Sequence, residues 1–569
     1  MTTVESTIPA TASQRPPGDL LEAVLAESRE LTAVERFAKA HDAGEVPAQA
    51  KHYHDLIPTG APGEGQQYAF DIDLDACSGC KACVSACHHL NGLETSETWR
   101  WVGQLSGLAS QATRGLPVIQ HVTTACHHCV DPGCLKGCPT NAYEKDPDTG
   151  IVRHLDDQCF GCQYCTMACP YEVPQYSKSK GIVRKCDMCH GRLAAGEAPA
   201  CVQACPNQAI RIAVVDTAET VAKTDAGEFL PDSPPSQLTH PTTVYRSQRG
   251  LPADAIGFDY DHAEPQHAHL PLVVMLVLTQ MSVGAVAIGS LLRWLGGGLA
   301  TDAAIVLGAA VGQAGLAAAT LHLGRPHLAF RAALGWRHSW LSREALIFGA
   351  YAATSVTAAL FAAMPVLESL LPRFAIDLLN LVLPAPTRPA AEALAMLSGA
   401  AGIFCSAMIY VFTGREFWLG GRTFGKFFGT AAVLGFAGTL AAATAMAASS
   451  GAAVPAWVLW FLSLGTIAST FGKLWFERSI VAGPHQRTET LRLTAKLLDG
   501  PLSLISRARV TSAAIGGTLL PLLTLAVDGY TAAVLALIGF ALSVLGELAA
   551  RAIYFSAVVP LRMPGGLKS

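Results

Sequence analysis

The stretch Cys159-Phe-Gly-Cys162-Gln-Tyr-Cys165-Thr-Met-Ala-Cys169-Pro170 decides the fold of the first half of this chain. Its spacing, C-x2-C-x2-C-x3-C, occurs a second time, and two further tetrads keep the closing C-x3-C-P with a more distant third cysteine. Sixteen of the seventeen cysteines therefore fall into four tetrads. In chain order these are Cys77, Cys80, Cys83 and Cys87; Cys126, Cys129, Cys134 and Cys138; Cys159, Cys162, Cys165 and Cys169; and Cys186, Cys189, Cys201 and Cys205.

This spacing is typical of bacterial ferredoxins, in which three cysteines bind one cubane [4Fe-4S] cluster and the fourth reaches a neighbouring cluster. We therefore predict that all sixteen cysteines are iron ligands and that the tetrads work in pairs. Two alternatives are zinc, which paired C-x2-C knuckles also bind, and disulfides. The cysteines are too densely spaced for one tetrahedral ion per two knuckles, and no secretory signal precedes them, which disfavours disulfides. The leftover Cys405 lies in an apolar segment and is expected to pack as a small apolar side chain.

The sequence between the tetrads predicts a folded α+β domain of double-ferredoxin type over residues 67–215. Residues 67–74 alternate polar and apolar side chains, as a short strand does. Residues 142–144 and 151–154 flank the turn-forming run Asp146-Pro-Asp-Thr-Gly150 and predict a hairpin. Residues 209–215 are predicted to form the closing strand.

The second half, residues 268–569, predicts an all-α membrane bundle. Its apolar runs are each about long enough to cross a hydrocarbon core of about 30 Å. They are rich in Ala and Gly, which favours close contact between helices in lipid. The seventh run contains Gly516, Gly517 and Pro521. Eight spans are predicted, at about 270–292, 303–321, 345–365, 391–413, 427–448, 454–476, 509–527 and 530–550.

Basic residues predict the orientation of this bundle, because cytoplasmic connections carry an excess of Lys and Arg. The connections and tail on the side of the cysteine-rich domain hold sixteen such residues, and the opposite side holds three, so we expect the cysteine-rich domain and the C-terminus in the cytoplasm. The sixteen are Arg325, Arg331, Arg337, Arg343, Arg415, Arg422, Lys426, Arg478, Arg487, Arg492, Lys496, Arg507, Arg509, Arg551, Arg562 and Lys568, and the three are Arg293, Arg373 and Arg388.

Histidine placement bears on a membrane haem, which needs imidazole ligands inside the bundle. His322, His327, His338 and His485 all lie in predicted connections. We therefore predict that the chain binds no haem.

The cysteine-rich domain resembles the four-cluster iron-sulfur subunit of the dimethyl sulfoxide reductase family of molybdenum enzymes over residues 68–215. The shared signature includes Lys185-Cys-Asp-Met-Cys189 and the run from Pro199-Ala-Cys201 to Pro206. The resemblance implies four [4Fe-4S] clusters, with the first and fourth tetrads sharing two and the second and third sharing the others. By the ferredoxin exchange rule, Cys205 then completes the cluster of the first tetrad, Cys87 that of the fourth, Cys169 that of the second and Cys138 that of the third.

The membrane half resembles the eight-span, haem-free anchor of the same family, which exchanges electrons with quinone. The matching segments are Leu321-His-Leu-Gly-Arg-Pro326, the run 339–344 and, beyond them, 410–423 and 547–555. A quinone needs an apolar slot, a hydrogen-bond partner and a proton acceptor, and His322 and Glu344 fit the last two roles. The alternatives are that His322 caps a helix or binds lipid headgroups and that Glu344 pairs with Arg343.

The remaining segments carry no predicted chemistry. Residues 1–66 form a polar N-terminal extension with one helix-like stretch at 19–39, and residues 216–267 form a linker strap. Within the strap, the run 242–245 resembles a family segment that lies along the cluster domain. A net charge of -4 over 569 residues gives no signal for nucleic-acid binding. Residues 420–426 nearly match a phosphate-binding loop but fail at Phe427, where a hydroxyl is needed.

These features predict an electron-transfer and quinone-reactive subunit of a membrane oxidoreductase. The resemblance implies a separate catalytic subunit that holds molybdopterin, and the predicted cytoplasmic orientation favours a sulfite dehydrogenase-like complex over a dimethyl sulfoxide reductase-like one. Two alternatives are a ferredoxin:quinone oxidoreductase without a molybdenum partner and a transporter with a redox-sensing domain. The transporter alternative predicts ionisable residues at mid-membrane and inverted repeats with broken helices. The predicted spans show neither feature, since Lys473, Glu547 and Arg551 lie near span ends.

Overall fold

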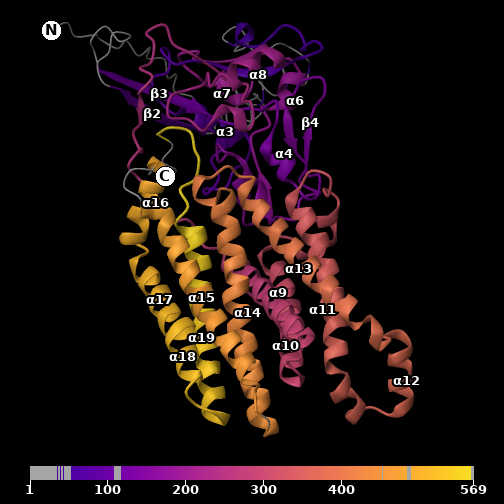
Figure 1. The fold of residues 1–569 in the computed structure, drawn as a ribbon. Helices are drawn as coiled ribbons and strands as arrows, with labels where there is room; N and C mark the ends of the chain where they lie inside the picture. Colours follow the sequence, from indigo (N-terminus) through magenta and orange to yellow (C-terminus); the bar gives the residue numbers. More distant parts are fainter. Residues whose placement is uncertain are drawn as a thin grey trace, which may run out of the picture.

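The computed structural model describes residues 53–107, 117–451, 453–482 and 488–565, together with the isolated positions Glu35, Lys39 and Ala43. The chain divides into a cysteine-rich domain and a long helical bundle that meets it at one end (Figure 1). The predicted helix-like stretch 19–39 lies almost entirely outside the described residues, as do Arg487, Lys568 and His485.

The three strand predictions for the cysteine-rich domain are confirmed. Strand β1 (Gln66–Asp73) pairs antiparallel with β8 (Ile210–Asp216), and β4 (Tyr143–Lys145) pairs antiparallel with β5 (Val152–His154). In the β4–β5 turn the Asp146 carboxylate accepts the backbone N–H groups of Asp148 and Thr149 at 3.0 and 2.9 Å, which fixes the turn. The first and last strands of the predicted domain therefore lie side by side and close it.

The predicted strap is also part of this domain. It holds helix α8 (Thr217–Asp225) and strand β9 (Val244–Arg246), which pairs parallel with β1 to give the sheet order β8-β1-β9. This confirms that the run 242–245 lies along the domain. A short strand, β10 (Ile256–Gly257), joins a second sheet with β2 (Trp101–Gly107) and β3 (Val118–Thr124) in the order β10-β2-β3.

Short elements complete the domain. Strands β6 (Gln175–Ser177) and β7 (Ile182–Arg184) form a further antiparallel hairpin. Of the short helices given next, all but the first and the last carry or follow cysteines. The helices are η2 (His54–Leu56), α3 (Ala82–Leu90), α4 (Gly133–Gly137), α5 (Tyr164–Ala168), α6 (His190–Ala194), α7 (Ala200–Gln203) and η3 (Ser236–Leu238).

In the part of the chain that the structure describes, seven helices are long and apolar enough to cross a membrane. They correspond to seven of the eight predicted spans, and α9 is the most buried of them, which places it at the centre of the bundle. The seven are α9 (Leu270–Trp294), α10 (Leu299–Ala318), α11 (Trp340–Leu370), α13 (Arg388–Val411), α14 (Gly420–Ser450), α15 (Ala456–Val481) and α19 (Gly529–Ser556).

The remaining predicted span, at 509–527, is an interrupted helix. It consists of α17 (Ser503–Ala514), the π-helical turn η8 (Ile515–Leu519) and α18 (Leu520–Thr524), all packed along α19. Pro521 lacks a backbone N–H, and its ring would clash with the carbonyl four residues earlier, so the chain widens into a π turn there. Because of this interruption, the predicted count of eight spans is matched by only seven uninterrupted helices.

Two amphipathic helices lie at opposite ends of the bundle (Figure 1). Helix α12 (Arg373–Val382) follows α11 at the end far from the cysteine-rich domain, and α16 (Glu489–Asp499) lies next to that domain. Lys496 of α16 contacts Asp261 of the strap at 2.6 Å. The short helices in the connections are η4 (Ala319–His322), η5 (Pro326–Ala333), η6 (Ala385–Thr387) and η7 (Glu416–Trp418).

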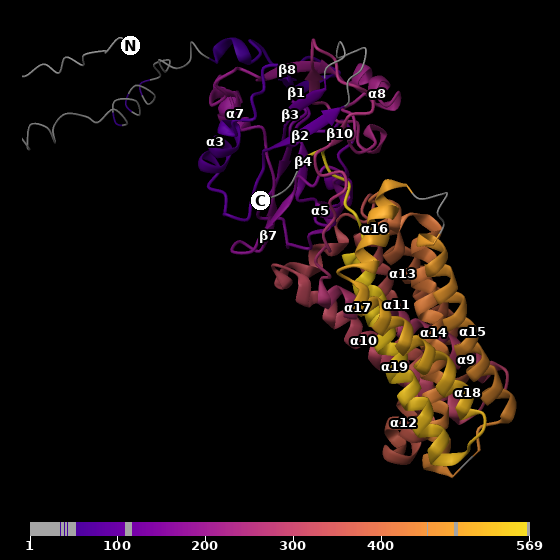
Figure 2. The same cartoon turned by 90° about the vertical axis from the view of Figure 1, so that its left-hand side faces the viewer.

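After α19 the chain returns to the cysteine-rich domain, and Figure 2 shows the yellow segment that follows α19 running up to it. Arg562 forms an ion pair with Asp259 at 2.7 Å, and the Gly565 N–H donates to the same carboxylate at 2.7 Å. Met563 is fully buried among the core residues of the domain. Gly565 adopts φ +64° and lies so close to Gln104 that a Cβ would overlap its backbone nitrogen. The tail therefore ties the last helix back to the first domain.

Candidate functional site

Each of the four Cys-x-x-Cys loops contains a residue with left-handed backbone immediately before its second cysteine. Gly79 and Gly161 have φ values of +72° and +74°, and His128 and Met188 have +43° and +58°. This conformation bends the loop sharply, and glycine adopts it at the least cost. The two thiols of each loop can therefore point toward one centre.

Two small cavities reveal which thiols converge. One is lined by Cys77, Cys80, Cys83 and Cys205, and we call these four thiols the outer group. The other is lined by Cys126, Cys129, Cys134 and Cys169, which we call the third group after its place in the order given below. In each group three thiols come from one sequence tetrad and the fourth comes from another, as the exchange rule predicted.

Electrostatic contacts place the remaining eight thiols. Burial raises the pKa of Cys87 to about 12, with a further contribution from the charges of Cys201 and Cys189. Burial likewise raises the pKa of Cys162, with further contributions from the charges of Cys138 and Cys159. The second group is therefore Cys87, Cys186, Cys189 and Cys201, and the inner group is Cys138, Cys159, Cys162 and Cys165.

The donor set fits iron-sulfur clusters. Among the described residues, no three His, Cys, Asp or Glu side chains converge tightly enough to share one metal ion, and the thiols instead surround a space. Backbone N–H groups donate to several sulfurs, at 3.2 Å from Ala142 to Cys138 and at 3.3 Å from Ala209 to Cys205. Such donors stabilise negative charge on cluster ligands and tune cluster potential.

One cation inside the domain was not singled out by the sequence. Lys185 is 3 % exposed, and its Nζ lies 3.6 Å from the sulfur of Cys126. Burial lowers its pKa, but the nearby thiolates of Cys126, Cys134 and Cys186 outweigh burial and raise it overall. The ammonium therefore stays charged between the second and third groups. The sequence signal that could have found Lys185 was its place at the start of the motif Lys185–Cys189.

The four groups follow one another toward the bundle. Burial raises the pKa of Cys83, and the charge of Cys201 contributes to the rise. The outer and second groups are therefore neighbours. Burial also raises the pKa of Cys186, with Cys126 of the third group among its neighbours. The buried Tyr143 interacts with Cys165 of the inner group and Cys134 of the third. The order is therefore outer, second, third, inner.

The inner group lies against the connection between α10 and α11. The Gly324 N–H donates to the Gly161 carbonyl at 3.4 Å, and the Arg325 N–H donates to the Phe160 carbonyl at 3.0 Å. From the other end of the connection, the Ser339 hydroxyl donates to the Gly137 carbonyl at 2.7 Å. These contacts hold the bundle against the loops that carry the inner thiols.

Glu344 lies one turn into α11, below the inner group. It is only 4 % exposed, and the Ser406 hydroxyl lies beside its carboxyl group. Burial raises the pKa of Tyr164, and the charge of Glu344 adds to that rise, so the carboxylate is close to a side chain located between Cys162 and Cys165. The Tyr164 hydroxyl itself donates to the Ile409 carbonyl at 2.9 Å. Sequence reasoning missed Tyr164, because its role depends on contact between distant segments.

The alternative pairing of Glu344 with Arg343 is not seen. Arg343 instead donates to the carbonyls of Trp336 and Arg337, at 3.1 and 2.7 Å, and lies over the Trp340 ring at 4.4 Å. Within the described residues, Glu344 has no ion pair.

His322 is the last residue of η4, two residues before Gly324. Its Nδ1 is buried without a hydrogen bond of good geometry within the described structure, although the Ala319 backbone is near, and the charge of His269 acts on the imidazole. No interaction among the described residues joins His322 to Glu344. The structure thus places both residues at the end of the bundle that meets the inner group, but on different elements.

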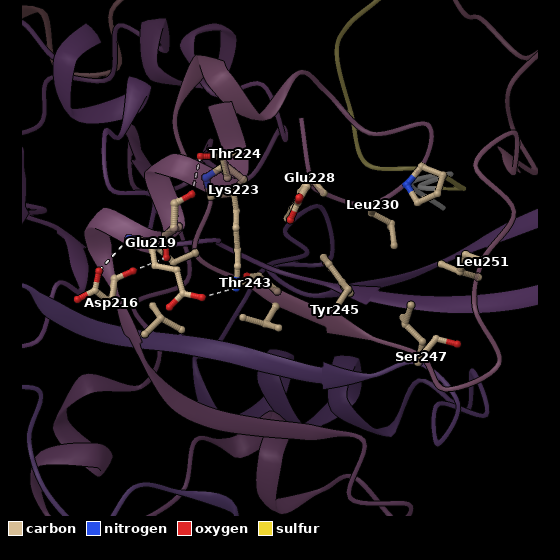
Figure 3. Close-up of a pocket in the computed structure, with 18 of the residues that line it drawn as sticks. Asp216, Glu219, Lys223, Thr224, Glu228, Leu230, Thr243, Tyr245, Ser247 and Leu251 are labelled. Atoms are coloured by element: carbon tan, nitrogen blue, oxygen red, sulfur yellow. Dashed lines mark hydrogen bonds and ion pairs between the residues drawn. The ribbon is translucent and has the colours of Figure 1, made fainter. Parts of the chain in front are cut away.

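A larger cavity, of about 610 Å³, lies elsewhere on the cysteine-rich domain (Figure 3). It is bordered by α8, β8 and the strap, and its labelled lining residues include Glu219, Lys223, Thr243 and Tyr245. It contains no thiol. The redox chemistry suggested by the thiol groups therefore lies apart from this cavity.

Comparison with known proteins identifies the cysteine-rich domain. Residues 118–215 match the model of the 4Fe-4S dicluster domain. The B subunit of anaerobic dimethyl sulfoxide reductase from Haemophilus influenzae is 37 % identical over 200 residues, which are 34 % of this chain and 96 % of that protein. The B subunit of the same enzyme from Escherichia coli is 40 % identical over 154 residues, which are 26 % of this chain and 75 % of that protein.

A further relative is the thiosulfate reductase electron transfer subunit PhsB of Salmonella typhi, 38 % identical over 154 residues, which are 27 % of this chain and 79 % of that protein. The matched dicluster domain falls in the cysteine-rich half, where the thiols are grouped as iron-sulfur clusters require. Through this domain, the protein belongs to the family of iron-sulfur subunits represented by the B subunit of anaerobic dimethyl sulfoxide reductase.

Proposed function

We propose that the chain is the electron-transfer and quinone-reactive subunit of a membrane-bound molybdenum oxidoreductase. The sixteen grouped cysteines are the proposed ligands of four [4Fe-4S] clusters, which supply one-electron carriers when bound. The single observation that carries this proposal is the continuous order of the thiol groups, from the partly exposed outer group to the inner group beside the bundle. Helix α3 carries a thiol of each of the first two groups, Lys185 contacts Cys126 of the third, and the bundle contacts the loop of the inner group.

The two ends of this order suit two different partners. In the outer group Cys80 is exposed and Cys77 and Cys205 are partly exposed, so a docked protein can approach that group. The inner group faces the bundle, where an apolar ring and tail can lie in the membrane. A catalytic subunit is therefore proposed at the outer end and a quinone at the inner end.

Oxidation of a quinol releases two electrons and two protons, so a quinone site needs proton-accepting groups as well as a route for electrons. Glu344 is the proposed proton acceptor, because its carboxyl is buried beside Tyr164 and has no cationic partner among the described residues. His322 is the proposed hydrogen-bond partner of a quinone carbonyl, because its Nδ1 is buried without a partner of good geometry. The reverse reaction, quinone reduction, uses the same groups.

The identity of the catalytic partner is argued from the relatives. Two of them are subunits of dimethyl sulfoxide reductase and one is an electron transfer subunit of thiosulfate reductase. We propose that this chain likewise serves a catalytic subunit, one that holds molybdopterin. A sulfite dehydrogenase-like complex is favoured over a dimethyl sulfoxide reductase-like one, because the proposed orientation places the catalytic side in the cytoplasm.

Two of the three basic residues at the far end of the bundle form ion pairs. Arg293 and Arg388 both contact Asp302, at 3.1 and 2.5 Å, and Arg388 also contacts Glu392 at 2.7 Å. These two arginines are therefore neutralised within the protein. Basic residues on the side of the cysteine-rich domain are paired as well, among them Lys496 and Arg562, so the proposed orientation rests on the number of Lys and Arg residues on each side.

A second candidate function, redox-coupled transport, is favoured by two specific observations. Lys473 and Glu547 form a buried ion pair inside the bundle, although the sequence places both near the ends of predicted spans. Helices α15 and α19 extend past those predicted ends, to 481 and 556. The interrupted helix α17–α18 lies beside them. Proteoliposomes in which quinol oxidation moves ions across the membrane beyond the two protons released per quinol would favour this function, and turnover without such movement would exclude it.

The decisive test of the first proposal is the composition of the native complex. The chain, purified from its native membrane under mild detergent, is expected to carry a partner subunit and about one molybdenum atom per polypeptide. A preparation that contains no molybdenum but accepts electrons from reduced ferredoxin would replace this proposal with the ferredoxin:quinone alternative.

A further inference from the structure

A cavity of about 470 Å³ opens in the bundle at the end near the cysteine-rich domain. It lies between α14, α15, α17 and α19, with α16 at its rim. Charged side chains line one part of it and aromatic side chains line another. Its principal lining residues are Lys426, Phe471, Trp475, Glu477, Arg509 and Tyr554.

Lys426 lacks a partner in this cavity. The residue is 6 % exposed, and its Nζ makes no hydrogen bond to any described residue. The ammonium lies 3.4 Å from the ring centroid of Phe417 and 5.2 Å from that of Tyr554. Aromatic rings attract a cation, but they do not replace the hydrogen bonds that a buried ammonium loses with its water. An acceptor is therefore missing from its surroundings.

The nearby carboxylates are engaged with other cations. Glu547 pairs with Lys473 and accepts the Thr430 hydroxyl at 2.7 Å. Glu477 contacts Arg509 at 2.5 Å and Lys473 at 3.6 Å. Lys426 is thus a surplus positive charge at the polar part of the cavity, and an anion would compensate it.

The mouth of the cavity has a different character. Phe471 and Trp475 of α15 are 70 % and 67 % exposed on a membrane-spanning helix, so their rings face lipid chains. Arg478, also exposed at the lining, has no ion pair among the described residues, and Asp499 lies at the rim. An occupant with an anionic head and apolar chains matches both parts.

We propose that this cavity binds an anionic glycerophospholipid. The headgroup phosphate accepts a hydrogen bond from Lys426, and the acyl chains lie along Phe471 and Trp475. A quinone fits less well, because its neutral carbonyls leave the ammonium uncompensated. The cavity lies at the end of the bundle where lipid headgroups are found, which suits a phosphate. This site is independent of the proposed quinone site and of the catalytic partner.

The test is native mass spectrometry of the full-length chain in mild detergent, titrated with phosphatidylglycerol or phosphatidylcholine of identical acyl chains. The wild-type chain is expected to bind one phosphatidylglycerol at least about tenfold more tightly than phosphatidylcholine, because the choline cation offsets the phosphate charge that would compensate Lys426. Lys426→Met is expected to abolish that preference. The matched control is Arg507→Gln, which removes an exposed cation from α17 and is expected to leave the preference unchanged.

A second variant keeps the test decisive if Lys426→Met fails to fold. Ala550 lines the cavity, and Ala550→Phe fills it without changing its charge, so phosphatidylglycerol binding is expected to fall to the phosphatidylcholine level. Equal lipid preference in the wild-type chain and in either folded variant would overturn the proposal. Displacement of phosphatidylglycerol by excess inorganic phosphate, or bound quinone that disappears in Ala550→Phe, would overturn it as well.

Discussion

Glu344 is the residue on which the proposed quinone chemistry most depends. Its carboxyl is buried next to Ser406, its charge acts on Tyr164, and Cys405 lies nearby. Sequence reasoning treated Cys405 as an ordinary packing residue, which its 4 % exposure confirms, but could not place it beside this carboxyl.

Replacing Glu344 tests its role. Glu344→Gln removes the proton acceptor while keeping the side-chain shape, so the quinol-oxidation rate is expected to fall on the order of 100-fold with unchanged iron content. The control is Glu368→Gln, at an exposed position near the other end of the same helix. Stopped-flow reduction of the chain by a quinol analogue measures both. A Glu344→Gln chain that is reduced at the wild-type rate would remove this residue from the quinone site.

The cysteines could be read from the sequence because their spacing is local. Within a tetrad, loop geometry follows from the residues between the cysteines, such as Gly79 and Gly161 with their left-handed backbone. The side chains around the groups could not be read in the same way. Lys185 contacts the sulfur of Cys126 from another tetrad, and Tyr164 contacts Ile409 and lies close to Glu344 in the bundle, so only the folded chain brings these groups together.

Among the elements, the connection between α10 and α11 carries the contact between the two halves of the molecule. Gly324 packs directly on the loop of Gly181, and a Cβ on Gly324 would overlap the Gly181 carbonyl oxygen. Gly324→Ala is therefore expected to separate the inner group from the bundle. Quinol-driven reduction should fall, while iron content should stay at the wild-type level.

A matched glycine on the neighbouring helix serves as the control for that substitution. A Cβ on Gly349 of α11 would meet nothing within 4 Å, and alanine is the better helix former, so Gly349→Ala should leave electron transfer unchanged. Equal rates in the two variants would show that the connection does not set the electron path.

The ion pair between Lys473 and Glu547 joins α15 to α19 inside the bundle. Lys473→Met leaves a buried carboxylate without its main cation, so the free energy of unfolding is expected to fall by about 3–5 kcal/mol. The double variant Lys473→Met/Glu547→Gln should lose less than the sum of the single losses. Denaturant unfolding in detergent measures all three variants, and additive losses would indicate that the pair is not coupled.

The helices themselves were largely predictable, because runs of about twenty apolar residues need no tertiary information. The interrupted segment at 503–524 was the exception. There Pro521 and the adjacent Gly516 and Gly517 break the regular hydrogen bonding, and how the chain resolves this depends on its packing against α19. The β2–β3 hairpin was also missed, since its pairing joins segments separated by residues 108–116.

At the scale of the whole molecule, the orientation of the bundle sets the side on which the partner docks. A fluorescent protein fused after the C-terminus is expected to fluoresce in intact cells, because positive charge retains that end in the cytoplasm. An alkaline phosphatase inserted at the α12–α13 connection should be active, since that connection lies at the opposite end of the bundle. An alkaline phosphatase that is active at the C-terminus, with a fluorescent protein that fluoresces at the α12–α13 connection, would show the reverse topology. That result would remove the argument for a cytoplasmic catalytic subunit.

The central claim is that sixteen thiols, grouped as the structure groups them, hold four cubane clusters between a protein partner and the membrane. The most direct test is the content of iron and acid-labile sulfide in anaerobically purified full-length chain. The account predicts about sixteen of each per polypeptide. Zinc in place of iron, or far fewer than sixteen irons with all thiols intact, would contradict it.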